Sequence, residues 1–292
     1  ISFGFFDPGD SDLLAQVQKK AKEYVHTVRS WNNSLVTPGI GPHSIYSVTK
    51  AGLLWTQEFH KEHHTPIHIH LSETMQEVET CRKEYQTTPV GLLRKTGLLH
   101  SGTIAAHCCC LDEGECVCVG KEGLQVAHCP VSNLKLAVGK VMPYPRLKAA
   151  GAHVGLGTDG AASNNSLNMM QTMRIASQLQ KFAWNDTSIL SPGEVHTMAT
   201  RSGAQALQLR TGMLRKGFPA DIILMKRGTS LPCRFGCEPA SQIQNGGITV
   251  DTTICNGHIL MLHEYIPGER EILQAASNAA GRLMHEELKQ NY

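Results

Sequence analysis

Strand-like apolar runs alternate with helical runs about five times within residues 1–210. This alternation constrains the fold most, because it is typical of a parallel sheet whose strands are joined by crossover helices. In a barrel built this way, the chemistry collects at the carboxyl ends of the strands. Reactive side chains lie at four such ends: His43, His70, His107 and Asp159.

The expected strands are short and are flanked by helical patterns. Strands are predicted at 66–70, 103–107, 124–128 and 153–159, and at 35–43, where a strand runs into a Gly/Pro-rich loop. Helices are predicted at 11–31, 49–64, 74–85, 90–97, 143–150 and 166–182, with a short helix or turn at 112–122. Ser191, Pro192 and Glu194 supply an N-cap, a first-turn proline and a capping-box partner, so a further helix is expected to begin there.

Beyond Gly212 the pattern changes. Segments 217–225 and 251–261 resemble antiparallel strands, with a turn at Asn256-Gly257. A closing amphipathic helix is expected over about 269–289. The predicted organisation is a barrel portion at 1–210, a β-sandwich portion at 211–266 and a C-terminal helix at 267–292.

Composition limits the partners and the compartment. The formal net charge of +2 gives no reason to expect nucleic acid or an acidic membrane surface as a partner. No apolar run approaches the roughly 20 residues that span a bilayer, and no signal peptide is visible. The ten cysteines include three consecutive ones at 108–110, and neighbouring cysteines rarely bridge each other. A reducing, cytoplasmic compartment is therefore expected.

The segment Pro66-Ile-His-Ile-His-Leu-Ser-Glu-Thr carries the strongest chemical signal. A strand that ends in His70, with Glu73 just beyond it, can place a metal ligand beside a proton shuttle. Asp159 supplies a second ligand type that suits zinc. A metal there would make hydroxide available near neutral pH, and His107 could hydrogen-bond it. Any one of these residues alone is more often structural, but their conjunction at strand ends favours a site.

Other motifs leave alternatives open. Gly155-Leu-Gly-Thr-Asp-Gly160 matches a dinucleotide-binding pattern by letter, but no acidic residue follows about 20 positions on, so the match is taken as accidental. The Cys and His residues between 107 and 129 are interpreted as buried thiols in preference to a second zinc site. His43 is either a turn residue or a substrate contact. Ser132 and Asn133 either hold a polar substrate or organise a turn.

Several segments together resemble the amidohydrolase superfamily, in particular its methylthioadenosine/S-adenosylhomocysteine deaminase and chlorohydrolase group. They are Gly-Pro-His43-Ser-Ile-Tyr, His-Ile-His70-Leu-Ser-Glu73-Thr, Ala-Ala-His107-Cys, His128-Cys-Pro-Val-Ser-Asn-Leu-Lys-Leu, Gly-Leu-Gly-Thr-Asp159-Gly-Ala-Ala-Ser-Asn-Asn-Ser-Leu and Gly-Met-Leu-Arg-Lys-Gly-Phe-Pro-Ala-Asp221-Ile-Ile. The likeness covers nearly the whole chain in order.

This resemblance implies an α/β fold, a (β/α)8 TIM-like barrel with an appended β-sandwich, and one divalent metal, zinc or iron. It implies hydrolytic deamination of a purine nucleoside derivative, in which metal-bound hydroxide attacks the amine-bearing ring carbon. His70 and Asp159 would be metal ligands, Glu73 the proton shuttle and His107 the residue that orients the hydroxide. Asp159 would also act as a base. The implied substrate-binding residues are His43, Glu73, Ser132 and Asn133.

The resemblance also implies features that this sequence does not show. The family's first barrel strand carries a His-x-His pair of metal ligands, and no such pair precedes His43. A complete barrel takes about 250 residues, whereas the barrel-like pattern ends near residue 210. The chain opens at Ile1, so we expect an N-terminally truncated barrel that lacks its opening strands, and with them part of the β-sandwich.

Two alternatives to the deaminase hypothesis stay open at this point. One is hydrolysis of triazine-like or guanine rings by the same hydroxide, and the other is a non-catalytic homologue that cannot hold metal. The expected partner is a small-molecule substrate, and the sequence leaves a homo-oligomer open.

Overall fold

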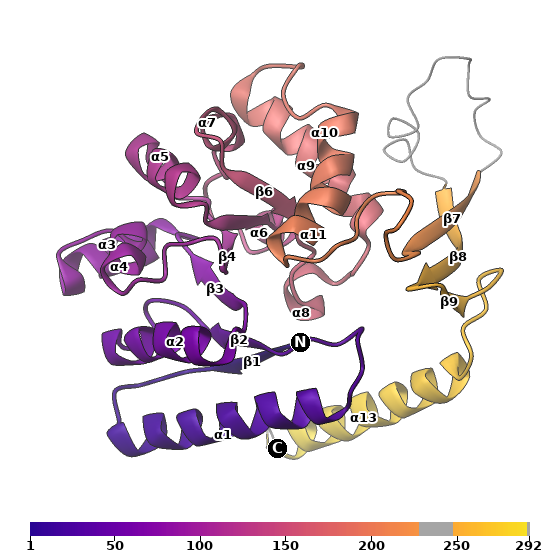
Figure 1. Ribbon diagram of the computed structural model, residues 1–292, viewed down its shortest axis with the longest axis horizontal. Helices are drawn as coiled ribbons and strands as arrows, with labels where there is room; N and C mark the ends of the chain where they lie inside the picture. Colours follow the sequence, from indigo (N-terminus) through magenta and orange to yellow (C-terminus); the bar gives the residue numbers. More distant parts are fainter. Residues whose placement is uncertain (228–247, 291–292) are drawn as a thin grey trace. The chain divides into compact units, whose positions relative to one another are not determined.

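The computed structural model describes residues 1–227 and 248–290, and side chains up to residue 283. Within that range the chain separates into two compact units, one of residues 1–213 and one that begins at residue 214. The first unit holds six parallel strands and the helices between them, and the second holds three antiparallel strands and a long helix (Figure 1). Among the described residues, no helix is both long enough and apolar enough to cross a bilayer.

The elements of the first unit alternate as the sequence predicts. Its strands are β1 Ser2–Phe5, β2 Gly39–Pro42, β3 Ile67–Leu71, β4 Thr103–His107, β5 Gln125–His128 and β6 His153–Leu156. Its helices are α1 Ser11–Ser30, α2 Lys50–His63, α3 Met75–Tyr85, α4 Pro89–Lys95, α5 Glu113–Glu122, α6 Pro130–Lys135, α7 Tyr144–Ala149, α8 Ala161–Asn164, α9 Met169–Trp184, α10 Pro192–Thr197, the π-helix η1 Met198–Ser202 and α11 Gly203–Ala206.

The six strands pair in chain order, and every pair is parallel. No pairing closes β1 onto β6 within the residues that the structure describes, so the sheet corresponds to part of a barrel. The predicted α/β fold with parallel strands is confirmed. All carboxyl ends of parallel strands lie at one edge of the sheet, which brings residues from distant parts of the sequence together.

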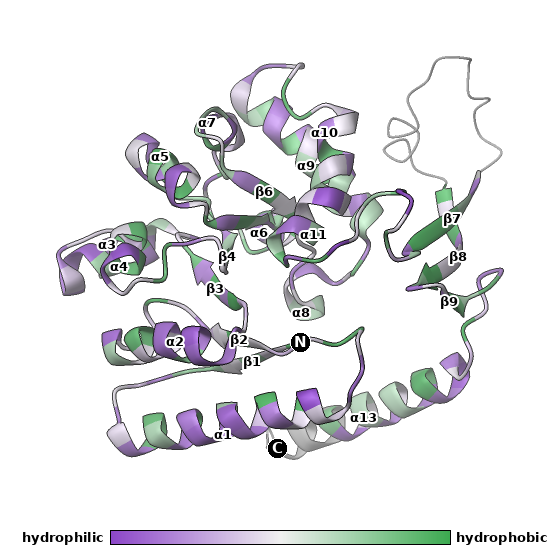
Figure 2. Ribbon diagram, viewed as in Figure 1, coloured by the Kyte–Doolittle hydropathy of each residue, from purple (hydrophilic) through white to green (hydrophobic). Residues whose placement is uncertain are grey.

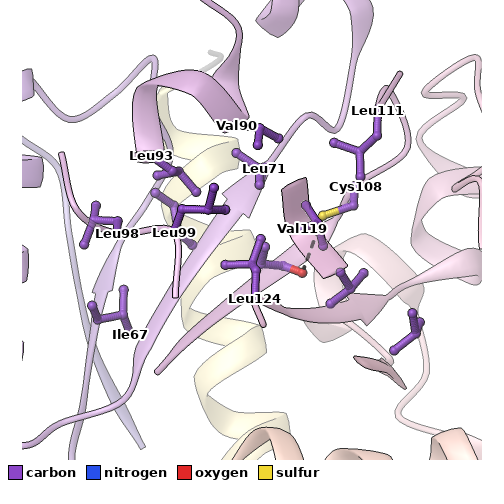
Figure 3. Packing of buried hydrophobic residues seen from close by; sticks show 14 of the residues in the cluster. Ile67, Leu71, Val90, Leu93, Leu98, Leu99, Cys108, Leu111, Val119 and Leu124 are labelled. Carbon is purple, nitrogen blue, oxygen red and sulfur yellow. Dashed lines mark hydrogen bonds between the residues drawn. The ribbon is translucent and has the colours of Figure 1, made fainter. Parts of the chain in front are cut away.

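The hydrophobic core lies between the sheet and its helices. Strand residues alternate between the two faces of a sheet, and Ile67, Ile69 and Leu71 of β3 are fully buried on the helix side. Figure 3 shows Leu71 packed with Val90 and Leu93 of α4, in a cluster of apolar side chains that come from the helices and from the loops beside the strands. Burial of each such side chain contributes roughly 1.5–3 kcal/mol, so β3 is a firm support for the residues on its other face.

Helix ends follow the predicted cap chemistry. Ser191 accepts a hydrogen bond from the backbone N–H of Glu194, whose side chain returns to Ser191, so the expected capping box is confirmed. The helix predicted at 166–182 begins later, at Met169, because the Asn168 side chain accepts from the Gln171 N–H and caps the helix there. In Figure 2 helix α1 carries both hydrophilic and hydrophobic residues along its length, as an amphipathic surface helix should.

The prediction for 35–43, a strand that runs into a Gly/Pro-rich loop, differs from the structure, because the Gly/Pro-rich part itself forms the strand. Residues 35–38 lie outside the sheet, and β2 consists of Gly39–Pro42 alone. A Cβ atom at Gly39 would lie 2.8 Å from the Ser2 Oγ atom and 3.2 Å from the Pro66 carbonyl oxygen. The two neighbouring strands therefore approach this position too closely for a side chain.

The second unit contains β7 Ile222–Arg227, β8 Ile248–Cys255, β9 His258–Met261 and α13 Glu269–Gln290. The strands pair antiparallel in the order β7-β8-β9. Asn256 and Gly257 join β8 to β9 and both have positive φ, 47° and 81°, as a tight hairpin turn requires. The hairpin turn at Asn256-Gly257 and the closing helix are as predicted, whereas the first strand begins at Ile222 and not within 217–221.

Candidate functional site

His70 is the central residue of the site. It lies on the face of β3 opposite Ile69 and Leu71, so the alternation of the strand turns its ring away from the core. Its Nδ1 atom is 2.6 Å from the backbone oxygen of His43, and a carbonyl can only accept. Nδ1 therefore donates, and the Nε2 lone pair of His70 is left available to a metal.

His107 faces the same site although its register does not predict it. It pairs with Leu71, whose side chain points to the core. However, His107 has a φ of +73° and Cys108 one of +53°, and this left-handed backbone turns the ring back toward β3. The His70 and His107 rings stack with centroids 5.4 Å apart and an interplanar angle of 16°. Strained backbone of this kind is common at functional sites.

Burial and neighbouring imidazoles keep His107 neutral. Desolvation, followed by the charge of His70, lowers the pKa of His107 to about 4. Its Nε2 atom lies 3.7 Å from a carboxylate oxygen of Glu73, and its Nδ1 lies 2.8 Å from the amide nitrogen of Asn133. His107 is thus held between an acid and an amide.

Glu73 lies in the loop between β3 and α3. Burial raises the pKa of its carboxyl group, and the neighbouring His70 and Asp159 charges act in opposite directions on it. A raised pKa makes a carboxylate a better proton acceptor, which suits an acid–base catalyst. This is the position that the sequence predicts for a proton shuttle.

Glu77 holds the loop that carries Glu73. The sequence does not predict this role. The two carboxylate oxygens of Glu77 accept from the backbone N–H groups of Ser72 and Glu73 at 2.9 and 2.8 Å. Desolvation raises the pKa of the buried Glu77 to about 7. The signal in the sequence is Thr74-Met-Gln-Glu77, a capping-box spacing at the start of a helix.

Asp159 follows β6 in a loop and has a φ of +63°. One carboxylate oxygen accepts from the Ser132 hydroxyl at 2.6 Å and the other from the Gly160 N–H at 2.6 Å. Burial works to raise the pKa of Asp159, but these hydrogen bonds and the nearby histidines outweigh it and lower the pKa. Asp159 is therefore an ionised carboxylate at neutral pH.

His43 follows β2, and its ring lies beside the stacked rings of His70 and His107. Its ring centroid lies 4.8 Å from that of His70 and 4.5 Å from that of Phe6, which stacks on it. Its Nδ1 atom contacts the Ser47 hydroxyl at 2.8 Å. Desolvation, together with the charge of His70, lowers the pKa of His43.

An open groove of about 390 Å³ begins beside His43. It is lined by Phe6, Asp7, Pro8, Tyr46, Ser47, Val48, Thr49 and Tyr85, none of which is a cation. The Asp7 carboxylate is engaged by the Thr49 hydroxyl and the Gly9 N–H. The groove therefore presents rings and apolar side chains, and offers no positive charge to an anionic group.

Two further sets of residues lie beside the reactive cluster. The His68 ring centroid is 6.3 Å from that of His70, and His68 also lines a separate cavity of about 250 Å³ with Ala127, Gly155 and Gly203. The consecutive cysteines at 108–110, together with Cys116 and Cys129, are buried free thiols, and desolvation raises the pKa of each of these thiols.

The sequence is similar to a known family and to named relatives. A family model described as the amidohydrolase family matches residues 2–260. A 5'-deoxyadenosine deaminase of Methanoregula boonei is 44% identical over 285 residues, which cover 97% of this chain and 64% of that protein. A 5-methylthioadenosine/S-adenosylhomocysteine deaminase of Desulforudis audaxviator is 38% identical over 275 residues, which cover 91% of this chain and 64% of that protein.

The fold is similar to that of a solved structure. An adenosine deaminase from Xanthomonas campestris with bound zinc superposes with a TM-score of 0.89 at 27% identity. The match covers 97% of this chain and 66% of that one. This chain therefore spans 64% of the length of both curated relatives described above.

Proposed function

This chain belongs to the amidohydrolase family, and from that premise we propose that it takes part in the hydrolytic deamination of a purine nucleoside of the adenosine type. It would be a hydrolase acting on carbon–nitrogen bonds other than peptide bonds. The observation that carries the proposal is the convergence of His70, Glu73, His107 and Asp159 at one edge of the sheet. The deaminases among its relatives support the same reaction.

The donor chemistry of His70 and Asp159 fits a divalent metal, and we propose zinc. His70 offers an Nε2 lone pair, since its Nδ1 is bound to a backbone carbonyl, and Asp159 offers an ionised carboxylate. The described residues contain no group of three or more His, Cys, Asp or Glu side chains arranged around one metal position. Catalytic zinc has three protein ligands as a rule, so the site needs at least one ligand beyond these two.

When bound, a divalent metal would supply a water that ionises at about pH 7. The chain's own residues then act on protons and orientation. The Glu73 carboxylate would take a proton from the attacking water and deliver it to the departing amine, which leaves as ammonia. The neutral ring of His107 would donate a hydrogen bond from Nε2 toward the attacking oxygen. Asp159 would serve as a second acceptor of the water proton.

We propose that His43 and the groove beside it bind the nucleoside. The stacked rings of His43 and Phe6 offer flat apolar surfaces on which a base or an apolar substituent can pack. Because none of the residues lining the groove is a cation, it suits an uncharged substituent such as a deoxy or methylthio group. The carboxylate of a homocysteine tail would find no cation among these residues.

The proposed assignments extend to the whole chain. Residues 1–210 would carry the chemistry, with 211–266 and 267–292 as separate accessory parts. The buried free thiols are compatible with a reducing compartment, and we propose a cytoplasmic location.

Ammonia release and metal content test this function. We expect the zinc-supplemented chain to release ammonia from 5'-deoxyadenosine and methylthioadenosine, and to act less well on S-adenosylhomocysteine. Glu73→Gln should lower kcat by about 100-fold or more, because the proton carrier is lost while shape is kept, and should leave zinc content unchanged. A chain that retains no zinc, or that releases chloride from a chlorinated triazine and no ammonia from these nucleosides, would contradict the proposal.

A further inference from the structure

Helix α6 connects two reactive residues from different parts of the sheet: His107 at the end of β4 and Asp159 in the loop after β6. Ser132 and Asn133 are 0% and 5% exposed. Ser132 donates its hydroxyl proton to Asp159 at 2.6 Å, and the Asn133 amide lies 2.8 Å from His107. Both side chains are therefore engaged within the protein, on the two residues that flank the site.

The helix itself is well anchored. It follows β5 directly and begins with Pro130, whose fixed φ suits a first turn. The Asn133 N–H bonds to the Cys129 carbonyl at 3.0 Å, and the Val138 N–H bonds to the Asn133 carbonyl at 3.2 Å. Lys135 at its end bonds to the Ala162 carbonyl at 2.7 Å. The backbone around Asn133 therefore has little freedom to move away from His107.

The amide of Asn133 determines which nitrogen of His107 carries the proton. An amide nitrogen only donates, so His107 Nδ1 must accept and the proton must be on Nε2. Nε2 in turn faces the Glu73 carboxylate at 3.7 Å, and a carboxylate is an acceptor. The opposite orientation of the amide would place a lone pair of His107 against that carboxylate, and it would leave both amide N–H groups of Asn133 unpaired. Only the first arrangement places a donor against an acceptor at both ring nitrogens of His107, and in it the Asn133 Oδ1 atom has no hydrogen-bond partner among the described residues.

We infer that Asn133 is a positioning residue that fixes His107 as the Nε2–H tautomer, and that Ser132 does the corresponding work of orienting the Asp159 carboxylate. The Nε2 proton of His107 therefore points toward the Glu73 carboxylate, beside which an attacking oxygen would lie. The tautomer follows from the contacts alone, whereas its consequence for catalysis rests on the proposed function.

Nitrogen NMR of the full chain measures the tautomer directly. With 15N-labelled histidine, two-bond proton–nitrogen correlations distinguish a protonated from an unprotonated ring nitrogen, and a His107→Gln spectrum identifies the His107 signals. At neutral pH we expect a protonated Nε2 and a bare Nδ1. Asn133→Asp should reverse the pattern, because a carboxylate of nearly the same shape accepts from Nδ1–H.

Two further variants keep the test decisive. Asn133→Ala should give a mixture of both tautomers, since the contact that keeps Nδ1 unprotonated is then gone and the Glu73 carboxylate, 3.7 Å from Nε2, lies beyond hydrogen-bond distance. Ser132→Ala removes a neighbouring hydrogen bond of the same helix and should leave the His107 tautomer unchanged. Unaltered signals from the other histidines show that each variant is folded. A protonated Nδ1 in the natural chain, or a single Nε2–H tautomer in Asn133→Ala, would overturn the inference.

Kinetics separates this inference from the proposed function. If the chain deaminates nucleosides, Asn133→Asp should lower kcat by about 10-fold or more with little change in KM, because orientation and not binding is lost. Equal losses in Asn133→Asp and Asn133→Ala with an unchanged tautomer would point to a merely structural role. A natural chain with no activity but with the Nε2–H tautomer would contradict the proposed function and leave the positioning inference standing.

Discussion

His128 is the most fully buried histidine of the structure's described part that lies outside the reactive cluster. It ends β5, is 1% exposed, and neither ring nitrogen has a hydrogen-bond partner within the described residues. Desolvation, then the neighbouring His107, lowers its pKa to about 3. Such a side chain is stable in the fold only while it is uncharged.

The stability of the chain should therefore fall in acid because of His128. The unfolded chain binds a proton near the ordinary pKa of 6.5, and the folded chain does not until about 3, so stability is present above 6.5 and is lost as the pH falls. Between about pH 8 and pH 5, the free energy of unfolding of His128→Leu should fall by about 2 kcal/mol less than that of the natural chain. Urea unfolding at both pH values measures this, and equal losses in the two proteins would contradict it.

The reactive residues could be predicted one by one because each follows a strand. His70, His107 and Asp159 stand at strand ends in the sequence, and parallel pairing brings strand ends to one edge. Their orientation could not be predicted, since His107 faces the site through a positive φ that its register contradicts. Glu77 was missed because its spacing reads as an ordinary helix cap, whereas its carboxylate bonds to residues before the cap.

At the scale of helices and strands, the elements that the sequence analysis does not predict are short. Strand β1 is Ser-Phe-Gly-Phe, and α6 has six residues inside a segment that reads as a turn. Neither is long enough to show a period of its own. Tertiary pairing creates β1, through its register with β2, and the proline after β5 starts α6. Longer elements such as α2 and α13 carry their own pattern and were predicted to within a few residues.

Helix α5 packs against the end of α7 through a glycine. A Cβ atom at Gly120 would fall well inside contact distance of the Ala150 backbone oxygen, which cannot move aside as a side chain would. Gly120→Ala should therefore destabilise the fold by about 1–3 kcal/mol or more, because the two helices must separate.

Gly114 in the same helix is a matched control. A Cβ atom there would meet only the Asp112 side chain, at 3.4 Å. Gly114→Ala should be neutral or stabilising by about 0.5–1 kcal/mol through helix propensity. Denaturant midpoints of the two variants give the comparison, and a Gly120→Ala protein as stable as Gly114→Ala would refute the packing argument.

At the scale of the whole molecule, the reactivity of the buried thiols measures how often the first unit unfolds. Cys108 is 0% exposed, Cys129 is 4% exposed, and burial raises the pKa of Cys129 to about 12. The thiolate is the reactive form, so these cysteines should react only when the first unit unfolds.

Alkylation followed by peptide mapping tests this protection. In the folded chain Cys118, which is partly exposed, should be modified at least about 10-fold faster than Cys108 or Cys129. In urea the modification of the buried pair should rise along the same curve as the loss of helical circular dichroism. Modification of Cys129 at the rate of Cys118 in the folded chain would argue against a closed core.

The order of the strands in the sheet also bears on how the protein is made. Each of β2 to β6 pairs with the strand that precedes it in the chain. A ribosome adds roughly 5–20 residues per second, so each strand emerges within seconds of the partner that it needs. Strands β2 to β6 can therefore join the sheet one after another during translation, each on the strand that precedes it. A nascent chain halted after β5 should already protect the backbone amides of β3 and β4 from solvent exchange.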